Sequence, residues 1–195
     1  KRSPLCGRNF EYFSEDPYLA GKMAVGYVRG IQSTGVASCV KHFAVNSQET
    51  RRQASDSVLD ERTLREIYLR AFEIVVRESQ PRCVMSSYNL VNGVYANENE
   101  HLLKDILRGE WGFEGAVVTD WGGSNDHVAG VGAGSDFDRP DPGLPPVREL
   151  MKAVKEGRLS EGVIDERVRE ALRLILPTTA ATSGAGDTFD VDAHH

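Results

Sequence analysis

The stretch Ala116-Val117-Val118-Thr119-Asp120-Trp121-Gly122-Gly123 decides how this chain is interpreted. It is a short run of small and β-branched residues that ends in a carboxylate, an indole and two glycines. A buried parallel strand has this pattern when it carries a functional side chain to the end of a sheet. The pattern occurs twice more, in Val36-Ala37-Ser38-Cys39-Val40 before Lys41-His42-Phe43 and in Cys83-Val84-Met85-Ser86-Ser87 before Tyr88-Asn89. We therefore expect three strands whose polar ends converge on one site.

Helical patterns separate the expected strands. Asp16-Pro17 is an N-cap followed by proline, which predicts a helix to about Gln32. The expected apolar face of this helix is Ala20, Met23, Tyr27 and Ile31. Asp60 is expected to cap the next helix, whose apolar stripe is Leu64, Ile67, Tyr68, Ala71, Ile74 and Val75. Further helices are expected from about Glu98 to Glu110, from about Ser124, from Pro145 to about Glu156 and after Ser160.

Turn and loop signals complete the pattern. The segment from Ala44 to Ser57 is polar and aperiodic, and we interpret it as a long functional loop. Asn92-Gly93 predicts a tight turn. A fourth strand is expected near Asp136. From Thr178 to Thr188 the residues are small and polar, which is typical of a linker.

Strands that alternate with helices predict a parallel α/β fold. A doubly wound sheet is one alternative, but such a sheet usually carries a glycine-rich phosphate loop, and neither a G-x-G-x-x-G nor a Walker sequence is present. A (β/α)8 barrel places polar groups at several strand ends, as in this chain, but typically needs about 250 residues. With 195 residues and about four strands, we expect an incomplete (β/α)8 TIM-type barrel over residues 1–176 and a linker over 177–195.

The composition excludes several classes of function. The chain is 40% hydrophobic and 27% charged, and its net charge of −6 argues against a nucleic-acid partner while suiting a neutral small-molecule substrate. No apolar stretch is long enough to span a bilayer and no signal peptide is visible, so we expect no membrane partner and a cytoplasmic location. The cysteines, Cys6, Cys39 and Cys83, are widely spaced, and we expect buried, reduced thiols rather than a disulfide or metal framework. His101, His127, His194 and His195 lack metal-ligand spacing, and we expect no metal or organic cofactor.

Asp120 is the leading candidate for catalysis. A carboxylate at a strand end beside Trp121 suits a sugar site, because an indole packs on the apolar C–H face of a pyranose and a carboxylate attacks or stabilises an oxocarbenium-like centre. The alternative is that Asp120 only caps the helix that follows. Tyr88, at the end of the preceding strand, is expected to face the same pocket, whereas Met85 fits core packing as well as a pocket wall.

Lys41-His42 is the second element of the expected site. A charged pair directly after a buried strand is costly without polar partners or a ligand, and two adjacent donors can hydrogen-bond neighbouring hydroxyls. A structural ion pair with the following loop is one alternative, and a Schiff-base role for Lys41, as in barrel aldolases, is another. Arg8 lies ahead of a helix cap, and it either reaches the same face or is an ordinary surface arginine.

Five motifs together resemble glycoside hydrolase family 3, and within it the bacterial β-glucosidases. They run in the same order between Lys1 and about Leu176: G-R-N-F-E-Y-F-S-E-D-P (Gly7 to Pro17), K-H-F (Lys41 to Phe43), N-x-Q-E-T-R-R (Asn46 to Arg52), M-S-S-Y-N (Met85 to Asn89) and V-V-T-D-W (Val117 to Trp121). The resemblance implies a retaining, exo-acting β-glycosidase that hydrolyses terminal β-D-glucosyl residues. The second histidine of the related N-acetylglucosaminidase loop, K-H-F-P-G-H-G, has no match after Phe43, which disfavours that chemistry.

The resemblance also implies roles for individual residues. Asp120 matches the nucleophile that forms the glycosyl-enzyme intermediate. The residues that match contacts to the glycone, or that line its subsite, are Arg8, Lys41, His42, Met85, Tyr88 and Trp121. The region from Gln48 to Arg52 is assigned no direct sugar contact. The segment from Val131 to Pro140 departs from the A-G-x-D-x-x-M-P-G-like pattern of the family, so the resemblance does not define the subsite wall after Asp120.

The resemblance implies that further parts are needed for activity. In family β-glucosidases the acid/base glutamate lies in a second α/β sandwich domain after the barrel, and a glycone-binding aspartate lies in an early barrel loop. Neither matches a residue between Lys1 and His195. We therefore expect a nucleophile and most of one subsite without the proton donor, with a β-glucoside or oligosaccharide and the absent sandwich domain as partners. The alternatives are a catalytically incomplete sugar-binding fragment and a Lys41 Schiff-base aldolase.

Overall fold

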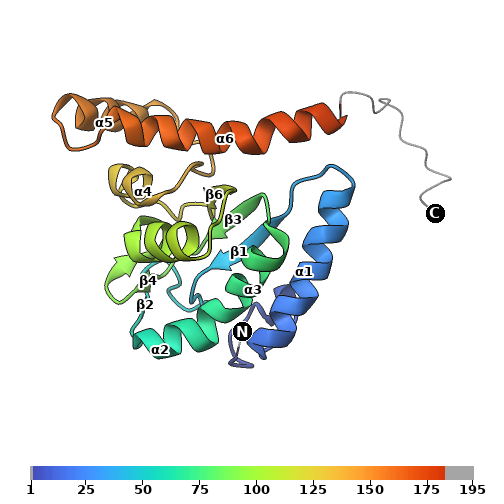
Figure 1. Cartoon of the computed structure of the whole chain (residues 1–195). Helices are drawn as coiled ribbons and strands as arrows, with labels where there is room; N and C mark the ends of the chain where they lie inside the picture. The colour runs from blue at the N-terminus through green and yellow to red at the C-terminus, as the bar shows by residue number, and fades with distance from the viewer. Residues whose placement is uncertain (1, 183–195) are drawn as a thin grey trace.

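A three-stranded parallel sheet forms the centre of the molecule. The computed structural model describes residues 2–182, in which β1 (Cys39–Phe43), β3 (Cys83–Ser86) and β6 (Ala116–Thr119) pair in the order β1-β3-β6 (Figure 1). All three strands run in the same direction and are separated in sequence by helices. This arrangement confirms the expected α/β class and is that of part of a (β/α)8 barrel.

A second, smaller sheet lies beside the first. It consists of β2 (Asp56–Ser57), β4 (Leu90–Val91) and β5 (Val94–Tyr95). The antiparallel hairpin β4–β5 turns at Asn92 and Gly93, whose φ angles are 51° and 87°. Two consecutive positive φ angles are the mark of a type I′ turn, which favours Asn-Gly. The predicted tight turn is confirmed.

Helices cover the sheet and carry the chain between its strands. Their bounds are η1 (Asn9–Glu11), α1 (Pro17–Ser33), α2 (Glu61–Thr63), η2 (Leu64–Leu69), α3 (Arg70–Ser79), η3 (Ala96–Glu98), η4 (His101–Glu110), α4 (His127–Ala133), α5 (Leu144–Lys155) and α6 (Glu161–Thr182). The expected caps are present, because the carboxylates of Asp16 and Asp60 accept hydrogen bonds from the N–H groups of Leu19 and Thr63. Both η2 and η4 are π-helical, a form that the 3.6-residue periodicity of the sequence does not predict.

The core fills the space between the sheet and these helices. Val84 and Val117 at the middle of their strands are fully buried, and so are the leucines and isoleucine of η4. The fully buried residues of that helix are Leu102, Leu103, Ile106 and Leu107. Because successive side chains of a strand point to opposite faces, the residues next to these two valines project from the other face of the sheet.

The apolar face expected for α1 is wrong. The buried positions of the helix are Gly21, Val25 and Val28, whereas Met23, Tyr27 and Ile31 are exposed. The helix packs against α3, and a Cβ atom at Gly21 would lie 3.0 Å from the Cβ atom of Ile74. Close approach at a glycine, rather than the largest side chains, therefore selects the face that is buried.

The segment after β6 also differs from the expectation. Asp126 caps α4, which begins at His127 rather than near Ser124. No fourth strand forms near Asp136 within residues 2–182, where Phe137 makes only an isolated parallel bridge with Val118. The backbone of Phe137 pairs with β6 at this one position, because its N–H donates to the carbonyl of Val117 at 3.0 Å and its carbonyl accepts from the N–H of Thr119 at 2.9 Å. The carboxylate of Asp136 adds a hydrogen bond from the backbone N–H of Val117 at 2.6 Å.

The last helix is longer than the sequence suggests. The expected cap at Ser160 is present, because its hydroxyl accepts a hydrogen bond from the N–H of Val163 at 3.3 Å. The helix then continues through Pro177 to Thr182, beyond the expected boundary at residue 177. The hydroxyl of Thr179 donates to the carbonyl of Ile175, four residues earlier, at 3.0 Å. The remainder of the expected linker, residues 183–195, lies outside the described part.

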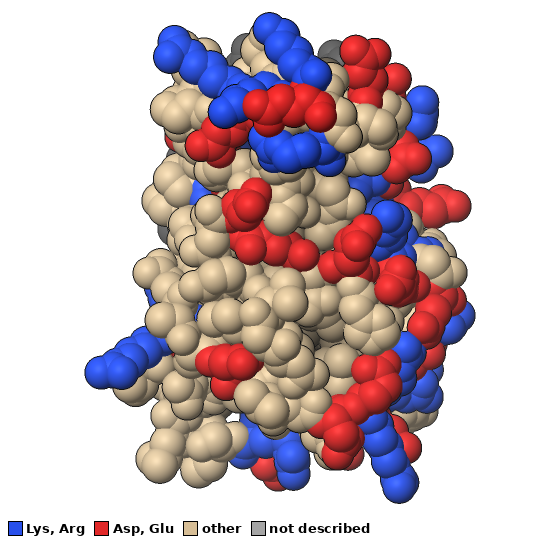
Figure 2. All heavy atoms as spheres, turned by 90° about the vertical axis from the view of Figure 1, so that its left-hand side faces the viewer, with Lys and Arg blue, Asp and Glu red and all other residues tan. Residues whose placement is uncertain are grey.

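Charge is mixed over the face that Figure 2 presents, where lysines and arginines lie among acidic side chains next to a wide uncharged area. The mixture agrees with the net charge of −6. Within residues 2–182, none of the helices combines the length and the apolar character that crossing a membrane requires.

Candidate active site

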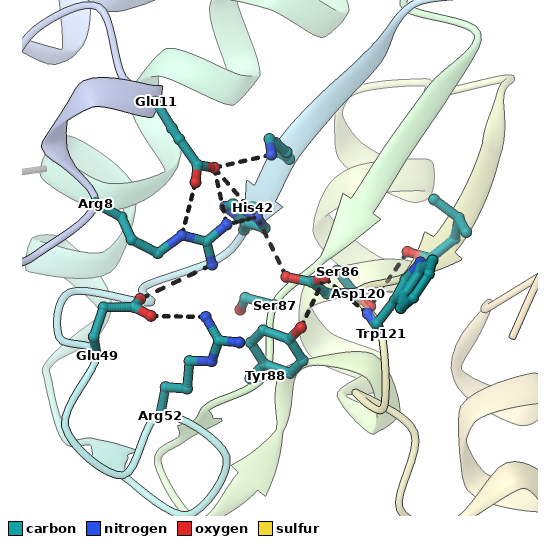
Figure 3. Close-up of polar contacts among 12 residues, drawn as sticks. Arg8, Glu11, His42, Glu49, Arg52, Ser86, Ser87, Tyr88, Asp120 and Trp121 are labelled. Atoms are coloured by element: carbon teal, nitrogen blue, oxygen red, sulfur yellow. Dashed lines mark hydrogen bonds and ion pairs between the residues drawn. The ribbon is translucent and has the colours of Figure 1, made fainter. Parts of the chain in front are cut away.

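Asp120 follows β6 directly and lies at the carboxyl ends of the three parallel strands (Figure 3). Its residue surface is only 8% exposed. Oδ1 accepts hydrogen bonds from the hydroxyl of Tyr88 at 2.9 Å and from the backbone N–H of Trp121 at 2.8 Å. Oδ2 is buried and accepts no hydrogen bond. One oxygen therefore fixes the orientation of the carboxylate, and the other keeps its lone pairs free.

His42, in β1, lies beside this free oxygen. Its Nε2 is 3.3 Å from Oδ2 of Asp120 and 3.2 Å from Nη2 of Arg8, and its Nδ1 is 2.6 Å from the hydroxyl oxygen of Tyr12. Burial, reinforced by the positive charge of Arg8, lowers the pKa of His42 to about 4. The ring is thus neutral at pH 7. Because a guanidinium only donates, Nε2 accepts from Arg8 and the proton lies on Nδ1.

Glu11 connects the cations of the site. Nε and Nη2 of Arg8 donate to its two carboxylate oxygens, each at 2.9 Å, and Nζ of Lys41 lies 2.9 Å from Oε2. The hydrogen bond from Arg8, together with the nearby ammonium of Lys41, lowers the pKa of Glu11 to about 2. Glu11 is consequently an anion at neutral pH, and it holds both cations at the strand ends.

The long loop after β1 adds a second ion pair. Oε2 of Glu49 accepts from Nη1 of Arg52 at 2.7 Å, and Oε1 of Glu49 lies 3.9 Å from Nη1 of Arg8. The guanidinium of Arg52 in turn lies over the ring of Tyr88, 4.5 Å from its centroid. The loop therefore supports Arg8 and Tyr88, and through Tyr88 it supports Asp120.

Buried polar side chains hold the turn after β3 against the strand end of β1. The hydroxyl of Ser87 donates to the carbonyl of Ala44 at 2.8 Å, and Nδ2 of Asn89 donates to the same carbonyl at 3.2 Å. The pairing of β1 with β3 is irregular between Val40 and Phe43. These side-chain hydrogen bonds supply the partners that a regular strand ladder would provide there.

The structure brings most of the expected site residues together. Arg8, Lys41, His42, Tyr88 and Asp120 form one connected cluster of hydrogen bonds and ion pairs. Trp121 takes part through its backbone N–H, while its residue surface is 67% exposed. Met85 pairs with Val118 in the sheet and is half-buried, without a polar contact to the cluster. The roles of all these residues in sugar binding and catalysis remain predictions.

Four further residues belong to the cluster and were not singled out from the sequence. They are Glu11, Tyr12, Glu49 and Arg52. Each lies within a motif that suggested the family, so the motifs carried the signal. Individual roles were not readable, because these residues act on other side chains rather than at a strand end. The interpretation of Arg8 as an ordinary surface arginine is wrong, because its guanidinium contacts Glu11 and His42. The segment expected as a loop over residues 44–57 contacts Arg8 through Glu49, but its last two residues form the strand β2.

The cysteines were expected to be buried and reduced, and one of the three is exposed. All three cysteines are free, and Cys6 and Cys83 are buried, but Cys39 is exposed, because β1 is the edge strand of the sheet. His101 lies 3.1 Å from Glu61, and His127 lies 2.6 Å from Asp138. His194 and His195 lie outside the described part. Within residues 2–182, no group of three or more His, Cys, Asp or Glu side chains is arranged to hold a metal ion.

The parallel sheet and the acidic strand end define the class of the protein, an α/β domain that forms part of a (β/α)8 barrel. The model for the glycosyl hydrolase family 3 N terminal domain matches residues 1–174, and the chain belongs to this family. The thermostable beta-glucosidase B of Acetivibrio thermocellus is 47% identical over 195 residues, which are 100% of this chain and 26% of that protein. An exo-alpha-(1->6)-L-arabinopyranosidase of Bifidobacterium breve is 46% identical over 194 residues, or 100% of this chain and 25% of that protein.

Solved structures agree with this assignment. Beta-glucosidase 3B from Thermotoga neapolitana, in complex with alpha-D-glucose, superposes with a TM-score of 0.93 and 47% sequence identity, and the match covers 99% of this chain and 28% of that one. The chain therefore spans about a quarter of the length of the relatives it matches. The fold and the family follow from these comparisons, whereas the activity of the whole protein does not.

Proposed function

We propose that this chain supplies the nucleophile and the sugar-binding face of a retaining β-glucosidase. The observation that carries the proposal is the buried Oδ2 of Asp120, which accepts no hydrogen bond while Oδ1 accepts two. A nucleophilic carboxylate needs one oxygen held in place and the other free to bond. A carboxylate that merely caps a helix would accept from the backbone N–H groups of that helix, and in α4 Asp126 has this role.

The reaction then has two displacement steps. Oδ2 of Asp120 bonds to the anomeric carbon while the bond from that carbon to the aglycone oxygen breaks, and the aglycone leaves with a proton from a general acid. A water molecule then attacks the same carbon, loses its proton to the conjugate base of that acid, and releases Asp120. Two inversions retain the configuration of the sugar.

The general acid of this proposal lies outside the described residues. Glu11 is a second carboxylate near His42, with its Oε2 3.9 Å from Nε2 of His42. The pKa of Glu11, about 2, makes it a poor proton donor. A retaining pair also requires carboxyl groups about 5–5.5 Å apart. We place the acid in a second domain that follows the barrel, because the relatives are about four times longer than this chain.

The neighbouring donors suit a glucosyl unit. The side chain of Lys41 is 42% exposed although its ammonium is paired with Glu11. The ammonium can therefore donate to a ligand as well. Arg8 donates to the same oxygen of Glu11, Oε2, that the ammonium of Lys41 approaches, so the two donors lie side by side. Vicinal hydroxyls of a sugar ring take such adjacent donors, and the exposed indole of Trp121 offers an apolar surface for the C–H face.

A Schiff-base aldolase fits the site less well. The reaction begins with a neutral amine, and such lysines are desolvated or placed next to another cation. Lys41 is instead half-exposed and lies 2.9 Å from a carboxylate, which stabilises the ammonium. Borohydride reduction in the presence of a carbonyl substrate would attach the substrate to Lys41 in an aldolase, and we expect no such adduct.

The test is mass spectrometry after incubation with 2,4-dinitrophenyl 2-deoxy-2-fluoro-β-glucoside, whose activated leaving group does not need the general acid. We expect one fluoroglucosyl unit on the peptide that contains Asp120. The label is expected to be lost in Asp120→Asn and kept in Asp165→Asn, an exposed aspartate on α6.

Two other outcomes are informative. A label on Asp120 that appears only in a longer protein containing this chain would support Asp120 as the nucleophile. It would also mean that the chain alone is a catalytically incomplete, sugar-binding fragment. No label in either would exclude Asp120 as the nucleophile. Because one group of relatives bears the name of an arabinopyranosidase, an aryl α-L-arabinopyranoside is the comparison substrate for the longer protein, and we expect the aryl β-glucoside to be hydrolysed faster.

A further inference from the structure

Two cysteines face each other on adjacent strands at the end of the sheet opposite Asp120. Cys39 is the first residue of β1 and Cys83 is the first residue of β3, and the two are register partners in the parallel pairing. Neighbouring strands lie about 4.7–4.9 Å apart. Side chains that project from one face at partnered positions are therefore in contact distance.

The packing of the valines that follow places both thiols on the same face. Val40 packs against α1 and α3 through Val25 and Ile74, and Val84 belongs to the buried core on the helical side of the sheet. Because side chains alternate along a strand, Cys39 and Cys83 project away from the helices. On this face Cys39 is exposed, whereas Cys83 is buried at 7% exposure.

The two thiols also interact with each other. A hydrogen bond between them lowers the pKa of the Cys39 thiol, with a further contribution from the ammonium of Lys41, and it raises the pKa of the Cys83 thiol. The accessible member of the pair is thus the better nucleophile, and its partner holds the second proton.

We propose that Cys39 and Cys83 form a dithiol site that binds one thiophilic centre, a trivalent arsenical or a soft two-coordinate metal ion, between their sulfur atoms. Soft thiolate ligands select soft ions. With an organic arsenic(III) oxide, two S–As bonds form and the oxygen on arsenic leaves as water with the two thiol protons, so no oxidant or reductant is needed. With a metal ion, the two protons are released to solvent.

The site lies one pleat below the proposed sugar site. Lys41 follows Cys39 by two residues on β1, and Met85 follows Cys83 by two residues on β3. A centre bound between the two sulfur atoms therefore lies under residues expected to line the glycone subsite. The binding itself does not rest on the proposed function, because it needs only the thiol pair.

Phenylarsine oxide is the probe, and mass spectrometry of the whole chain is the measurement. At one equivalent we expect a single phenylarsenic adduct per chain that survives excess glutathione, a monothiol, and is removed by 2,3-dimercaptopropanol, a dithiol. Cys6→Ser is the matched control, because Cys6 is also a buried cysteine but lies in the N-terminal segment. The adduct is expected to persist in Cys6→Ser and to be lost in Cys39→Ser and in Cys83→Ser.

Three outcomes would overturn the proposal: no adduct on the parent chain, an adduct that resists glutathione in Cys39→Ser, or loss of the adduct in Cys6→Ser. Cys39→Ser is the decisive variant, since an exposed position tolerates the change and circular dichroism will verify its fold. The readout is a mass, so a chain without glycosidase activity tests the site equally well.

Discussion

Nε2 of His42 lies 3.3 Å from Oδ2 of Asp120, yet the two groups do not share a hydrogen bond. The explanation lies in the proton position on the ring. Nε2 accepts from Arg8 and Nδ1 faces the hydroxyl of Tyr12, so neutral His42 presents no N–H to Asp120. A histidine that donated to Oδ2 would occupy the oxygen that a nucleophile needs. The hydrogen-bond pattern around His42 thus preserves the free oxygen of Asp120.

The first prediction concerns Tyr88, whose hydroxyl donates to Oδ1 of Asp120 at 2.9 Å. Tyr88→Phe removes this charge-assisted hydrogen bond, which is worth about 1.5–3 kcal/mol, and leaves the ring in place. We expect fluoroglucosyl labelling of Asp120 to slow by roughly ten- to hundred-fold. Tyr27→Phe, on the exposed face of α1, is the control and should label at the parental rate. Equal rates in both variants would show that Oδ1 is not oriented by Tyr88.

Two strand ends of the site were predictable because each has a local signature. An apolar run that stops at a polar residue identifies Asp120 and Tyr88 without any knowledge of their neighbours. The N-termini of α1 and α2 were predictable for the same reason, since Asp16 and Asp60 each accept a hydrogen bond from the backbone N–H three residues ahead. Such local patterns depend only on adjacent residues, and they survive in the folded chain. The buried strand expected before Lys41 and His42 is wrong, because β1 spans Cys39–Phe43, contains both residues and is an edge strand with Cys39 exposed.

Features that depend on distant contacts were not predictable. The buried face of α1 is set by the approach of Gly21 to Ile74, which lie 53 residues apart by their numbers. The bridging role of Glu11 depends on Arg8 and Lys41 meeting at one place. The carboxylate of Asp136 contacts Val117 and two arginines from η4 and α6, so its role depends on residues far from it in the sequence. In each case tertiary contacts override the local pattern.

The second prediction is a loss of stability in mild acid. The pKa of His42 is about 4 in the folded chain, whereas an unperturbed histidine, as in the unfolded chain, has a pKa of 6.5. Between these two pH values the unfolded chain therefore binds more protons than the folded chain. The free energy of unfolding therefore falls as the pH falls from about 6.5 to about 4. Glu11, whose pKa is lowered from 4.5 to about 2, adds a further loss between those values. Urea denaturation from pH 7 to pH 3 will measure both.

Variants separate the two contributions to this pH dependence. His42→Gln should flatten the decline between pH 6.5 and about 4, and Glu11→Gln should flatten the decline that lies below pH 4.5. A parental decline in the upper range that is unchanged in His42→Gln would mean that another group titrates there.

The third prediction concerns the ion cluster that attaches α6 to the sheet. The side chain of Asp136 is fully buried and lies 2.8 Å from Nη2 of Arg108 and 3.1 Å from Nε of Arg167. Glu170 pairs with both arginines. Asp136→Asn leaves two buried cations with one carboxylate, and we expect a loss of about 3–5 kcal/mol in the free energy of unfolding. Asp165→Asn, exposed on α6, should change it by less than about 0.5 kcal/mol. Comparable losses in the two variants would rule out a stabilising role for the cluster.

The fourth prediction compares two glycines of α1 that should respond with opposite sign. A Cβ atom at Gly21 would lie 3.0 Å from Ile74, whereas one at Gly26 meets no atom within 4 Å. Gly21→Ala therefore forces α1 away from α3, and overpacking of this kind costs about 1–3 kcal/mol. Gly26→Ala only improves helix propensity and should stabilise the chain by about 0.5–1 kcal/mol.

Thermal unfolding of the two alanine variants measures this difference directly. The substitutions add the same methyl group to the same helix, so the sign of each shift isolates the α1–α3 contact from the propensity of alanine. A rise in melting temperature for both variants would mean that α1 moves freely against α3. Because α1 leads into β1, such movement would also displace Lys41 and His42. The positions of these two residues beside Asp120 would then be set by contacts other than the packing of Gly21 against Ile74.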